Sequence, residues 1–378
     1  MKSKVEISLK KDSFAAGAEV AKICGKEANK INFVFNSPVY DAAKFIEGFE
    51  TVADSKNLIG FSTPAVLSKE GCVLNEEGFS ALMSIDDEEL TVGIAALSKE
   101  DSARETGRKV AKLALEEAEA EIAPDYFFMA ATDEEEMYIK GIQDVIGRVP
   151  CFGASPLKGE GYHLYCKKQV VDNGVAVAFF YTEKQINTKF SGMFNETKKV
   201  GVITLVSDNR LLVEINNQPA LDVYAKMLGK TKEEIKGHIK DNYLFNPLGV
   251  KDRLGDLVAI RNVEEEKEDG SLLMGANLSE NTALILMEKN KDEIVNDTET
   301  IIKYLKATVA DAAAYLMFNN VERSFKIEDQ RDELHKKVKA LVEDAGFLMP
   351  VCQREYGYAD DQTNTVGNLM MSFTVFEK

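Results

Sequence analysis

The sequence predicts a mixed α/β protein made of two similarly built domains. Short apolar runs bounded by turn residues alternate with segments of helical period along the whole chain. The chain has 378 residues, more than the roughly 250–300 residues at which one hydrophobic core stops growing. We therefore expect mixed sheets covered by helices in both halves of the chain.

Several segments are typical of strands, because each is a run of four to eight apolar or alternating residues between turn signals. They are residues 31–35, 79–84, 91–97, 126–130, 175–181, 200–206, 211–215, 257–263, 283–287 and 369–376.

Helical periodicity fills segments between these strands. Residues 103–118 place alanine and valine along one stripe, and residues 219–228 begin with Pro219, which a first helical turn tolerates. Apolar residues at helical spacing predict a long helix over 291–315 and a last helix over 328–345. Gly346 is suited to the C-terminal cap of that last helix.

A repeated pattern predicts internal pseudo-symmetry. A Gly-x-Ser turn at 60–62 and another at 153–155 are each followed by a polar segment, a glycine and a hydrophobic strand. Two related patterns follow, one beginning at 246–249 and one at 355–357. We interpret these as four half-units that form two domains, residues 1–190 and 191–378, joined in a polar segment.

Charge and hydropathy exclude several classes of partner. Lysine and arginine number 46 and aspartate and glutamate 63, so the net charge is −17. This acidic protein should repel nucleic acid and anionic membrane surfaces. No apolar run reaches the roughly 18 residues of a membrane span, and the N-terminus does not resemble a signal peptide. We expect a cytoplasmic protein that does not insert into membranes.

The chain lacks the usual signatures of catalysis. The three histidines, His163, His238 and His335, are far apart and have no metal-binding spacing. The sequence contains no phosphate-binding glycine motif. We therefore expect no catalytic residue, no cofactor and no metal. The cysteines form no C-x-x-C pair and are expected to be reduced: Cys24, Cys72, Cys151, Cys166 and Cys352.

Motifs in the first half resemble a known family. The stretch Gly60-Phe61-Ser62-Thr63-Pro64-Ala65 is similar to the G-C-S-T-x-G-E motif of the FIST N-terminal domain. Val149-Pro150-Cys151-Phe152-Gly153-Ala154-Ser155 resembles its second signature, a proline-led strand that ends in Phe-Gly-Gly-Ser.

The second half resembles the FIST C-terminal domain. The segment 219–224 and the turn 246–250 match that domain's pattern, as does Leu257-Val258-Ala259-Ile260-Arg261, which is similar to its V-V-R strand. Asp269-Gly270-Ser271-Leu272 resembles the turn that follows. The matches cover nearly the whole chain in the order found in the family.

Several polar residues of the family motifs are replaced. Phe61 stands where the family has cysteine, and Ala65-Val66 replaces a Gly-Glu pair. Of the family's C-x-G-R only Arg323 remains. Tyr356-Gly357-Tyr358 lacks the glutamate of a Y-G-E turn, and only Asn368 remains of a final H-N-x-T.

The FIST resemblance implies a non-catalytic sensor in intracellular signal transduction, with amino acids or related small carboxylates as a ligand class. It also implies a separate output protein, since the two domains use the whole chain. The residues expected to contact the ligand are Gly60, Phe61, Ser62, Thr63, Gly153, Ala154, Ser155, Arg261, Arg323, Tyr356 and Asn368.

Local chemistry leaves alternatives open for these residues. Ser62 and Ser155 could bind an anion or only close their turns. Arg261 and Arg323 could grip a ligand carboxylate or pair permanently with a buried acid. The acidic run 133–136 favours a solvated loop, but it follows the strand 126–130, where α/β proteins commonly bind ligands.

Two other functions remain as alternatives. One is a protein-interaction scaffold whose ligand pocket has decayed. The other is a hydrolase that uses Ser62, Ser155 or Cys151 as nucleophile, although no histidine is near them in sequence. A polar pocket around Arg261 would favour the sensor.

Overall fold

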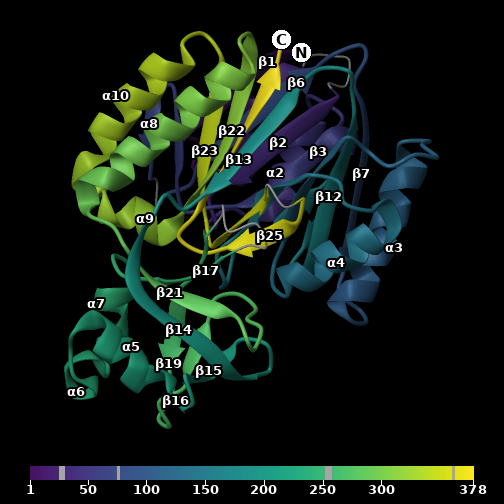
Figure 1. Cartoon of the computed structure of the whole chain (residues 1–378). Coiled ribbons are helices and arrows are strands. Elements are labelled where there is room, and N and C mark those ends of the chain that lie inside the picture. Colours follow the sequence, from purple (N-terminus) through teal and green to yellow (C-terminus); the bar gives the residue numbers. More distant parts are fainter. Residues whose placement is uncertain (25–29, 75–76, 252–257, 360–361) are drawn as a thin grey trace.

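The computed structural model describes residues 1–24, 30–74, 77–251, 258–359 and 362–378. Its helices and mixed sheets confirm the predicted α/β class. Figure 1 shows a large part with sheets inside and helices outside, and a smaller part below it. We call the larger part the body, residues 2–191 and 291–377, and the smaller part the inserted domain, residues 195–288.

The body contains three units with the same order of elements. The first unit holds β1 Lys2–Ser8, α1 Ser13–Val20, β2 Ile31–Asn36, α2 Ala42–Glu50, β3 Leu58–Ser62, the hairpin β4 Val66–Ser68 and β5 Gly71–Val73, and β6 Ser80–Asp86. The second holds β7 Thr91–Ser98, α3 Ala103–Glu117, β8 Tyr126–Ala131, α4 Glu135–Ile146, β9 Cys151–Ser155, the hairpin β10 Leu164–Cys166 and β11 Gln169–Val171, and β12 Gly174–Tyr181.

The third unit is interrupted by the inserted domain after its first strand. It holds β13 Ile186–Ser191, α8 Lys291–Thr308, β22 Ala312–Asn320, α9 Val321–Lys326, α10 Arg331–Val342, β23 Gly346–Cys352, the hairpin β24 Arg354–Tyr358 and β25 Asn364–Gly367, and β26 Met371–Glu377.

Each unit contributes four strands in the same arrangement. In each unit two neighbouring parallel strands are connected by a helical crossover; these pairs are β2–β3, β8–β9 and β22–β23. The last strand of the unit, β6, β12 or β26, lies antiparallel between the first strand and the parallel pair. The predicted internal repeats are therefore present, but as three units rather than four half-units.

Each unit also lends its hairpin to a neighbouring sheet. The hairpin β10–β11 extends the first sheet beside β3, and β24–β25 extends the second beside β9. The hairpin β4–β5 extends the third sheet beside β23. The first unit thus extends the third sheet, the second unit extends the first sheet and the third unit extends the second sheet, so each of the three six-stranded sheets contains strands from two units.

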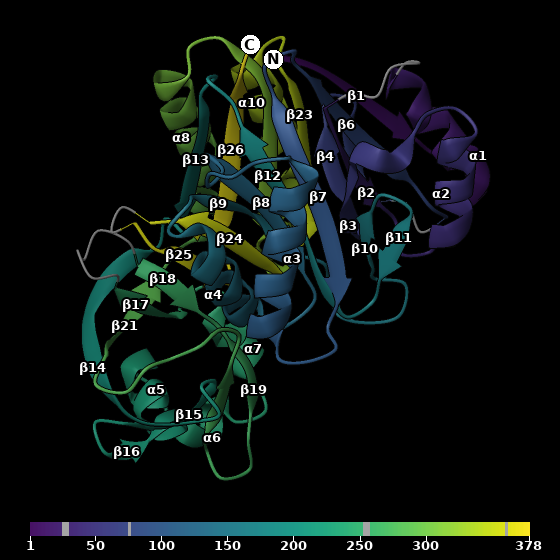
Figure 2. The same ribbon diagram turned by 90° about the vertical axis from the view of Figure 1, so that its right-hand side faces the viewer.

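One face of every sheet contributes to a shared aromatic core. Phe33 from the first sheet, Phe128 from the second and Phe318 from the third are all fully buried there. The rings of Phe33 and Phe128 lie 5.2 Å apart, and those of Phe128 and Phe318 lie 6.1 Å apart. Such aromatic burial is a major source of stability. The outer faces are covered by the helix pairs α1–α2, α3–α4 and α8–α10 (Figure 2).

The predicted helix over 291–315 runs too far. α8 ends at Thr308, and the apolar residues that continue its pattern begin β22 at Ala312. Burial between β23 and β26 favours the extended form of this run over its helical period. Gly346 begins β23 rather than capping α10, and Glu343, with a positive φ of 53°, is the C-cap residue of α10.

The inserted domain has its own sheet and core. Its elements are β14 Asn195–Ser207, β15 Leu211–Ile215, β16 Gln218–Pro219, α5 Ala220–Leu228, α6 Lys232–Ile235, α7 Ile239–Tyr243, β17 Leu248–Lys251, β18 Val258–Arg261, β19 Val263–Glu266, β20 Leu272–Met274 and β21 Ala283–Glu288. Leu221, Tyr224 and Leu272 are among its buried core residues. The repeat predicted to begin at 246–249 lies in this domain, outside the three units.

The predicted boundary between residues 190 and 191 falls inside β13, which pairs with β26 at the end of the chain. Strands from both sides of that position share sheets in the body. Whether residues 1–190 and 191–378 can fold as separate domains stays a prediction.

Candidate ligand-binding site

The two Gly-x-Ser sequences, which were predicted to be turns, instead form the last residues of strands β3 and β9 at equivalent places. Gly60 lies opposite Tyr165 on β10, and Gly153 lies opposite Tyr356 on β24. A Cβ atom at Gly60 would lie 1.8 Å from the Val34 carbonyl oxygen, and one at Gly153 would lie 2.0 Å from that of Met129. Glycine is therefore required for the close packing of neighbouring strands at both positions.

The residues of the first Gly-x-Ser sequence form hydrogen bonds within the body. The Ser62 hydroxyl accepts the backbone N–H of His163 at 3.1 Å, and the Thr63 hydroxyl donates to the carbonyl oxygen of Val351 at 2.7 Å. Phe61 packs in the shared aromatic core. Gly60, Phe61 and Ser62 therefore belong to strand β3 rather than to a turn, and together with Thr63 they connect β3 to neighbouring segments.

The second Gly-x-Ser sequence contributes to a buried polar network. The Ser155 hydroxyl donates to Glu135 at 2.7 Å and is hydrogen-bonded to the Tyr356 hydroxyl. Arg354, which is fully buried like Glu135, donates to the same carboxylate at 2.7 Å. Ala154, between Gly153 and Ser155 on β9, packs in the aromatic core. A buried hydrogen-bonded network therefore lies at the end of β9, next to the aromatic core.

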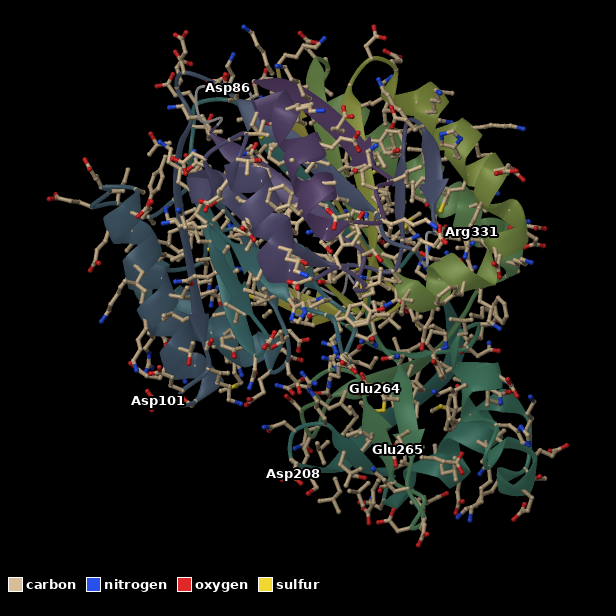
Figure 3. All side chains as sticks on the ribbon, turned by 180° about the vertical axis from the view of Figure 1, so that it is seen from behind. Asp86, Asp101, Asp208, Glu264, Glu265 and Arg331 are labelled. Atoms are coloured by element: carbon tan, nitrogen blue, oxygen red, sulfur yellow. The ribbon has the colours of Figure 1, made fainter. Side chains whose placement is uncertain are left out.

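The inserted domain supplies further charges to this network. Arg210, between β14 and β15, pairs with Glu136 at 2.6 Å and with Glu135 at 3.2 Å. Glu264, on β19, accepts from Arg354 at 2.8 Å. Figure 3 shows Glu264 at the junction of the body and the inserted domain. The two parts of the molecule are therefore joined by alternating charges.

The cations set the ionisation of the central carboxylate. Burial alone would raise the pKa of Glu135, but Arg354 and Arg210 hold it below its ordinary value. Glu135 is thus an anion near neutral pH, and its charge is compensated by arginines from both parts of the molecule.

A second polar cluster adjoins this network, because Glu355 follows Arg354 on β24. The Glu355 carboxyl group accepts the Asn320 side-chain N–H at 3.0 Å and the Met370 backbone N–H at 3.1 Å. Burial raises its pKa to about 8. Asn368 is also fully buried, and neither of its side-chain polar atoms has a hydrogen-bond partner in the described part of the chain. Burying an amide without hydrogen-bond partners costs free energy.

A cavity of about 310 Å³ opens at the same junction. This volume lies within the range of small-molecule sites. One wall belongs to α4 and the segment around β25, and the other to the inserted domain. The lining residues are Glu136, Ile139, Lys140, Gln143, Arg148, Arg261, Asn277, Thr363, Asn364, Thr365 and Val366.

Arg261 contributes a cation to the lining of this cavity. Its guanidinium donates to the carbonyl oxygens of Val366, Ile260 and Asn277 at 2.9, 3.1 and 3.3 Å. Among the described residues no carboxylate forms an ion pair with it. Burial lowers the pKa of Arg261, but a guanidinium remains charged in proteins. Leu257, at the start of the family-like strand, lies outside the described residues.

Arg323 does not reach the cavity. It is fully buried, pairs with Asp297 of α8 at 3.1 Å, and donates to the carbonyl oxygens of Gly192 and Leu369. The structural alternative, a permanent acidic partner, therefore describes Arg323. Gly153, Ala154, Ser155, Tyr356 and Asn368 lie in the polar clusters or in the core rather than on the cavity wall.

The residues of the hydrolase alternative have the following partners in the described structure. Within the described ranges, neither Ser62 nor Ser155 has a histidine ring as its hydrogen-bond partner. Burial raises the pKa of the Cys151 thiol well above its ordinary value, so it stays protonated near neutral pH. The His163 ring pairs instead with Asp172.

Comparison with protein families agrees with these features. A model of the FIST N domain matches residues 30–218, and a model of the FIST C domain matches residues 220–350. This chain belongs to the FIST family. FIST domains are associated with the sensing of small ligands in signal transduction. No curated protein matches the sequence significantly. In the described part of this FIST protein, no helix combines the length and the apolar character needed to cross a membrane.

Several residues of the junction were not predicted from the sequence. Glu135 and Glu136 lie in the acidic run noted after β8, so their place at a strand end gave a usable signal. Arg354 and Arg210 gave none, because they meet Glu135 across 219 and 75 positions of the FIST chain. Lys140 lies on α4 and Arg148 lies two residues after its end, and both resemble ordinary surface charges in the sequence.

Proposed function

We propose that this FIST protein is a non-catalytic sensor that binds a small carboxylate in the cavity around Arg261. The observation that carries the proposal is the placement of Arg261 itself. It projects from the inserted domain into a cavity whose opposite wall is the body, and its guanidinium is bonded only to carbonyl oxygens within the described structure.

The charges of the lining favour an anionic or zwitterionic ligand. Lys140 and Arg148 add two cations to Arg261, and guanidinium groups bind carboxylates with two parallel hydrogen bonds. Glu136 and the side-chain oxygen of Asn277 lie in the same lining and are acceptors for an ammonium group. An amino acid carries both groups, and amino acids are therefore the ligand class to test first.

The position of the cavity supports a sensing role. Glu136 belongs to the body but accepts from Arg210 and from the backbone N–H of Asn277, both in the inserted domain. A ligand that contacts Glu136 and Arg261 competes with or reinforces these contacts. It can therefore change the balance between two arrangements of the inserted domain and the body. We propose that a separate output protein in the cytoplasm responds to this change.

Thermal unfolding with a panel of amino acids and small carboxylates tests the proposal. A ligand present at a hundredfold excess over its dissociation constant should stabilise the folded protein by about 2.7 kcal/mol. Arg261→Ala should abolish the rise in midpoint, because the cation that binds the carboxylate is lost. Arg148→Ala, at the exposed side of the cavity, should weaken it.

Arg104→Ala is the matched control, since Arg104 lies outside the cavity and pairs with Asp144 on the surface. This variant should respond to ligand as the native protein does. If no compound raises the midpoint, or if Arg261→Ala responds like Arg104→Ala, the cavity is not the sensing site. Binding of a partner protein without any small ligand would then favour the scaffold.

A further inference from the structure

The pseudo-threefold arrangement places a third equivalent position at the end of β23. Met349 pairs with Leu67 of the lent hairpin, as Gly60 pairs with Tyr165 and Gly153 with Tyr356. Val351 pairs with Asn319 of β22, as Ser62 pairs with Asn36 of β2. At this third position the glycine, serine and tyrosine of the other units are replaced by methionine, valine and leucine.

A narrow pocket of about 40 Å³ lies at this third position. It is distinct from the cavity around Arg261. Its lining is mainly apolar and comes from the hairpin β4–β5, the end of β23 and the helices α9 and α10. The lining residues are Pro64, Ala65, Val66, Leu67, Cys72, Leu74, Asn319, Ser324, Phe325, Ile327, Arg331, Leu334, Met349 and Val351.

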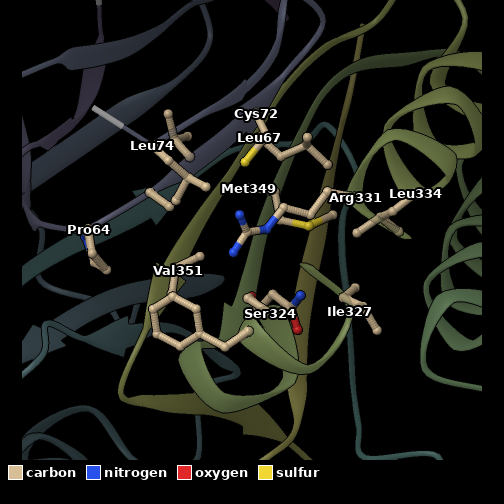
Figure 4. Close-up of a pocket in the computed structure, with 14 residues that line it drawn as sticks. Pro64, Leu67, Cys72, Leu74, Ser324, Ile327, Arg331, Leu334, Met349 and Val351 are labelled. Atoms are coloured by element: carbon tan, nitrogen blue, oxygen red, sulfur yellow. The ribbon is translucent and has the colours of Figure 1, made fainter. Parts of the chain in front are cut away.

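One cation is set among these apolar side chains. Figure 4 shows the guanidinium of Arg331 pointing from the start of α10 into the pocket. Its side chain is 15% exposed, and its ion pair in the described structure is with Glu328, at 3.3 Å. Glu328 is 71% exposed, so this pair is largely solvated and contributes little to stability. Arg331 can therefore bind another carboxylate at little cost.

The pocket also has an unmatched polar atom and exposed apolar groups. The side-chain oxygen of Asn319, a residue only 3% exposed, has no hydrogen-bond partner in the parts of the chain that the structure describes. Leu74 and Phe325 are 44% and 53% exposed at the lining. An occupant with an apolar chain would cover them, and a water molecule between a ligand carboxylate and Asn319 would donate to both oxygens.

We propose that this pocket binds a small aliphatic monocarboxylate. The carboxylate is held by the Arg331 guanidinium, and the hydrocarbon chain lies along Leu67, Met349 and Val351. Its volume of about 40 Å³ limits the occupant to a short chain of a few carbon atoms. The site is separate from the proposed sensing cavity and does not depend on it, because none of its lining residues is shared.

Cys72 provides a reporter inside the pocket. It is the exposed cysteine of the chain, whereas Cys24, Cys151, Cys166 and Cys352 are buried. We would measure its rate of modification by a small thiol reagent while titrating the native protein with butyrate. A pocket of about 40 Å³ has room for about three water molecules, which is close to the size of a four-carbon acid. Butyrate should slow the modification in a saturable manner. 1-Butanol and butylamine should protect far less at equal concentration, because neither offers an anion to Arg331.

Arg331→Ala should raise the butyrate concentration needed for protection about tenfold or more, the loss expected for a charge-assisted contact. Arg104→Ala, which removes a surface arginine outside both pockets, should leave protection unchanged. The comparison of butyrate with butanol uses the native protein, so it remains informative if Arg331→Ala folds poorly. Equal protection by butyrate and butanol, or no protection by butyrate, would overturn the proposal.

Discussion

Glu135→Ala is expected to lower the free energy of unfolding by about 3–5 kcal/mol. The substitution removes the anion that Arg354 and Arg210 share, and it leaves Arg354 fully buried beside a second arginine. Arg354 keeps its contact with Glu264, but that carboxylate is partly exposed and binds only one side of the guanidinium. Chemical denaturation with native and variant protein measures the loss.

The double variant Glu135→Leu/Arg354→Met shows how much of the lost stability comes from leaving Arg354 buried without its partner and how much from losing the attraction between the two charges. Replacing both partners removes the buried charges together, so it should cost less than the two single substitutions added. Asp101→Ala is the control, since Asp101 forms an exposed pair with Lys109 and its loss should hardly change the midpoint. A loss below about 1 kcal/mol for Glu135→Ala would mean that water reaches this network.

Glu355→Gln is expected to change how stability depends on pH. Burial raises the pKa of Glu355 from 4.5 to about 8, so between these values the folded protein binds a proton that the unfolded chain releases. The stability contributed by this group is complete below pH 4.5 and is lost as pH rises toward 8. The slope approaches about 1.4 kcal/mol per pH unit within that window.

Glutamine cannot ionise, so the variant should lose less stability than the native protein between pH 5 and pH 8. Its side-chain oxygen can still accept from Asn320. The groups facing Glu355 include Arg323 and the Cys352 thiol, and both remain in the variant. Denaturant titrations at pH 5, 6, 7 and 8 give the comparison. Parallel curves for the two proteins would show that Glu355 is already ionised when folded.

Local patterns in the sequence predict the elements well where each strand has a clear boundary. Residues 211–215 form β15 with the predicted bounds, and residues 126–130 form most of β8. The helix predicted over 291–315 was wrong at its end, because Val309 and Ala312 fit a helical stripe and a buried strand equally well. Three-dimensional burial, which the local pattern does not contain, decides between them.

The site was predictable only in part, for a similar reason. Arg261 stands out in the sequence as a charge at the end of an apolar strand, and it lines the cavity. Arg323 has the same local appearance, yet its distant partner Asp297 occupies it. Asp297 lies on α8, 26 positions before Arg323 and on the other side of β22, and no spacing rule connects the two. The lent hairpins likewise bring Arg354 to Glu135 without any local sign.

The exchanged hairpins also have a consequence for synthesis. Leu67 cannot pair with Met349 until the ribosome has made almost the entire chain, and the contact between Thr63 and Val351 spans 288 positions. The first unit therefore leaves the ribosome with a hairpin that has no sheet to join. Contacts so distant in sequence form slowly, and an unpaired strand can pair with another nascent copy. When many copies are translated close together, we expect some chains to pair their β4–β5 hairpin with β23 of another copy, which is a domain swap.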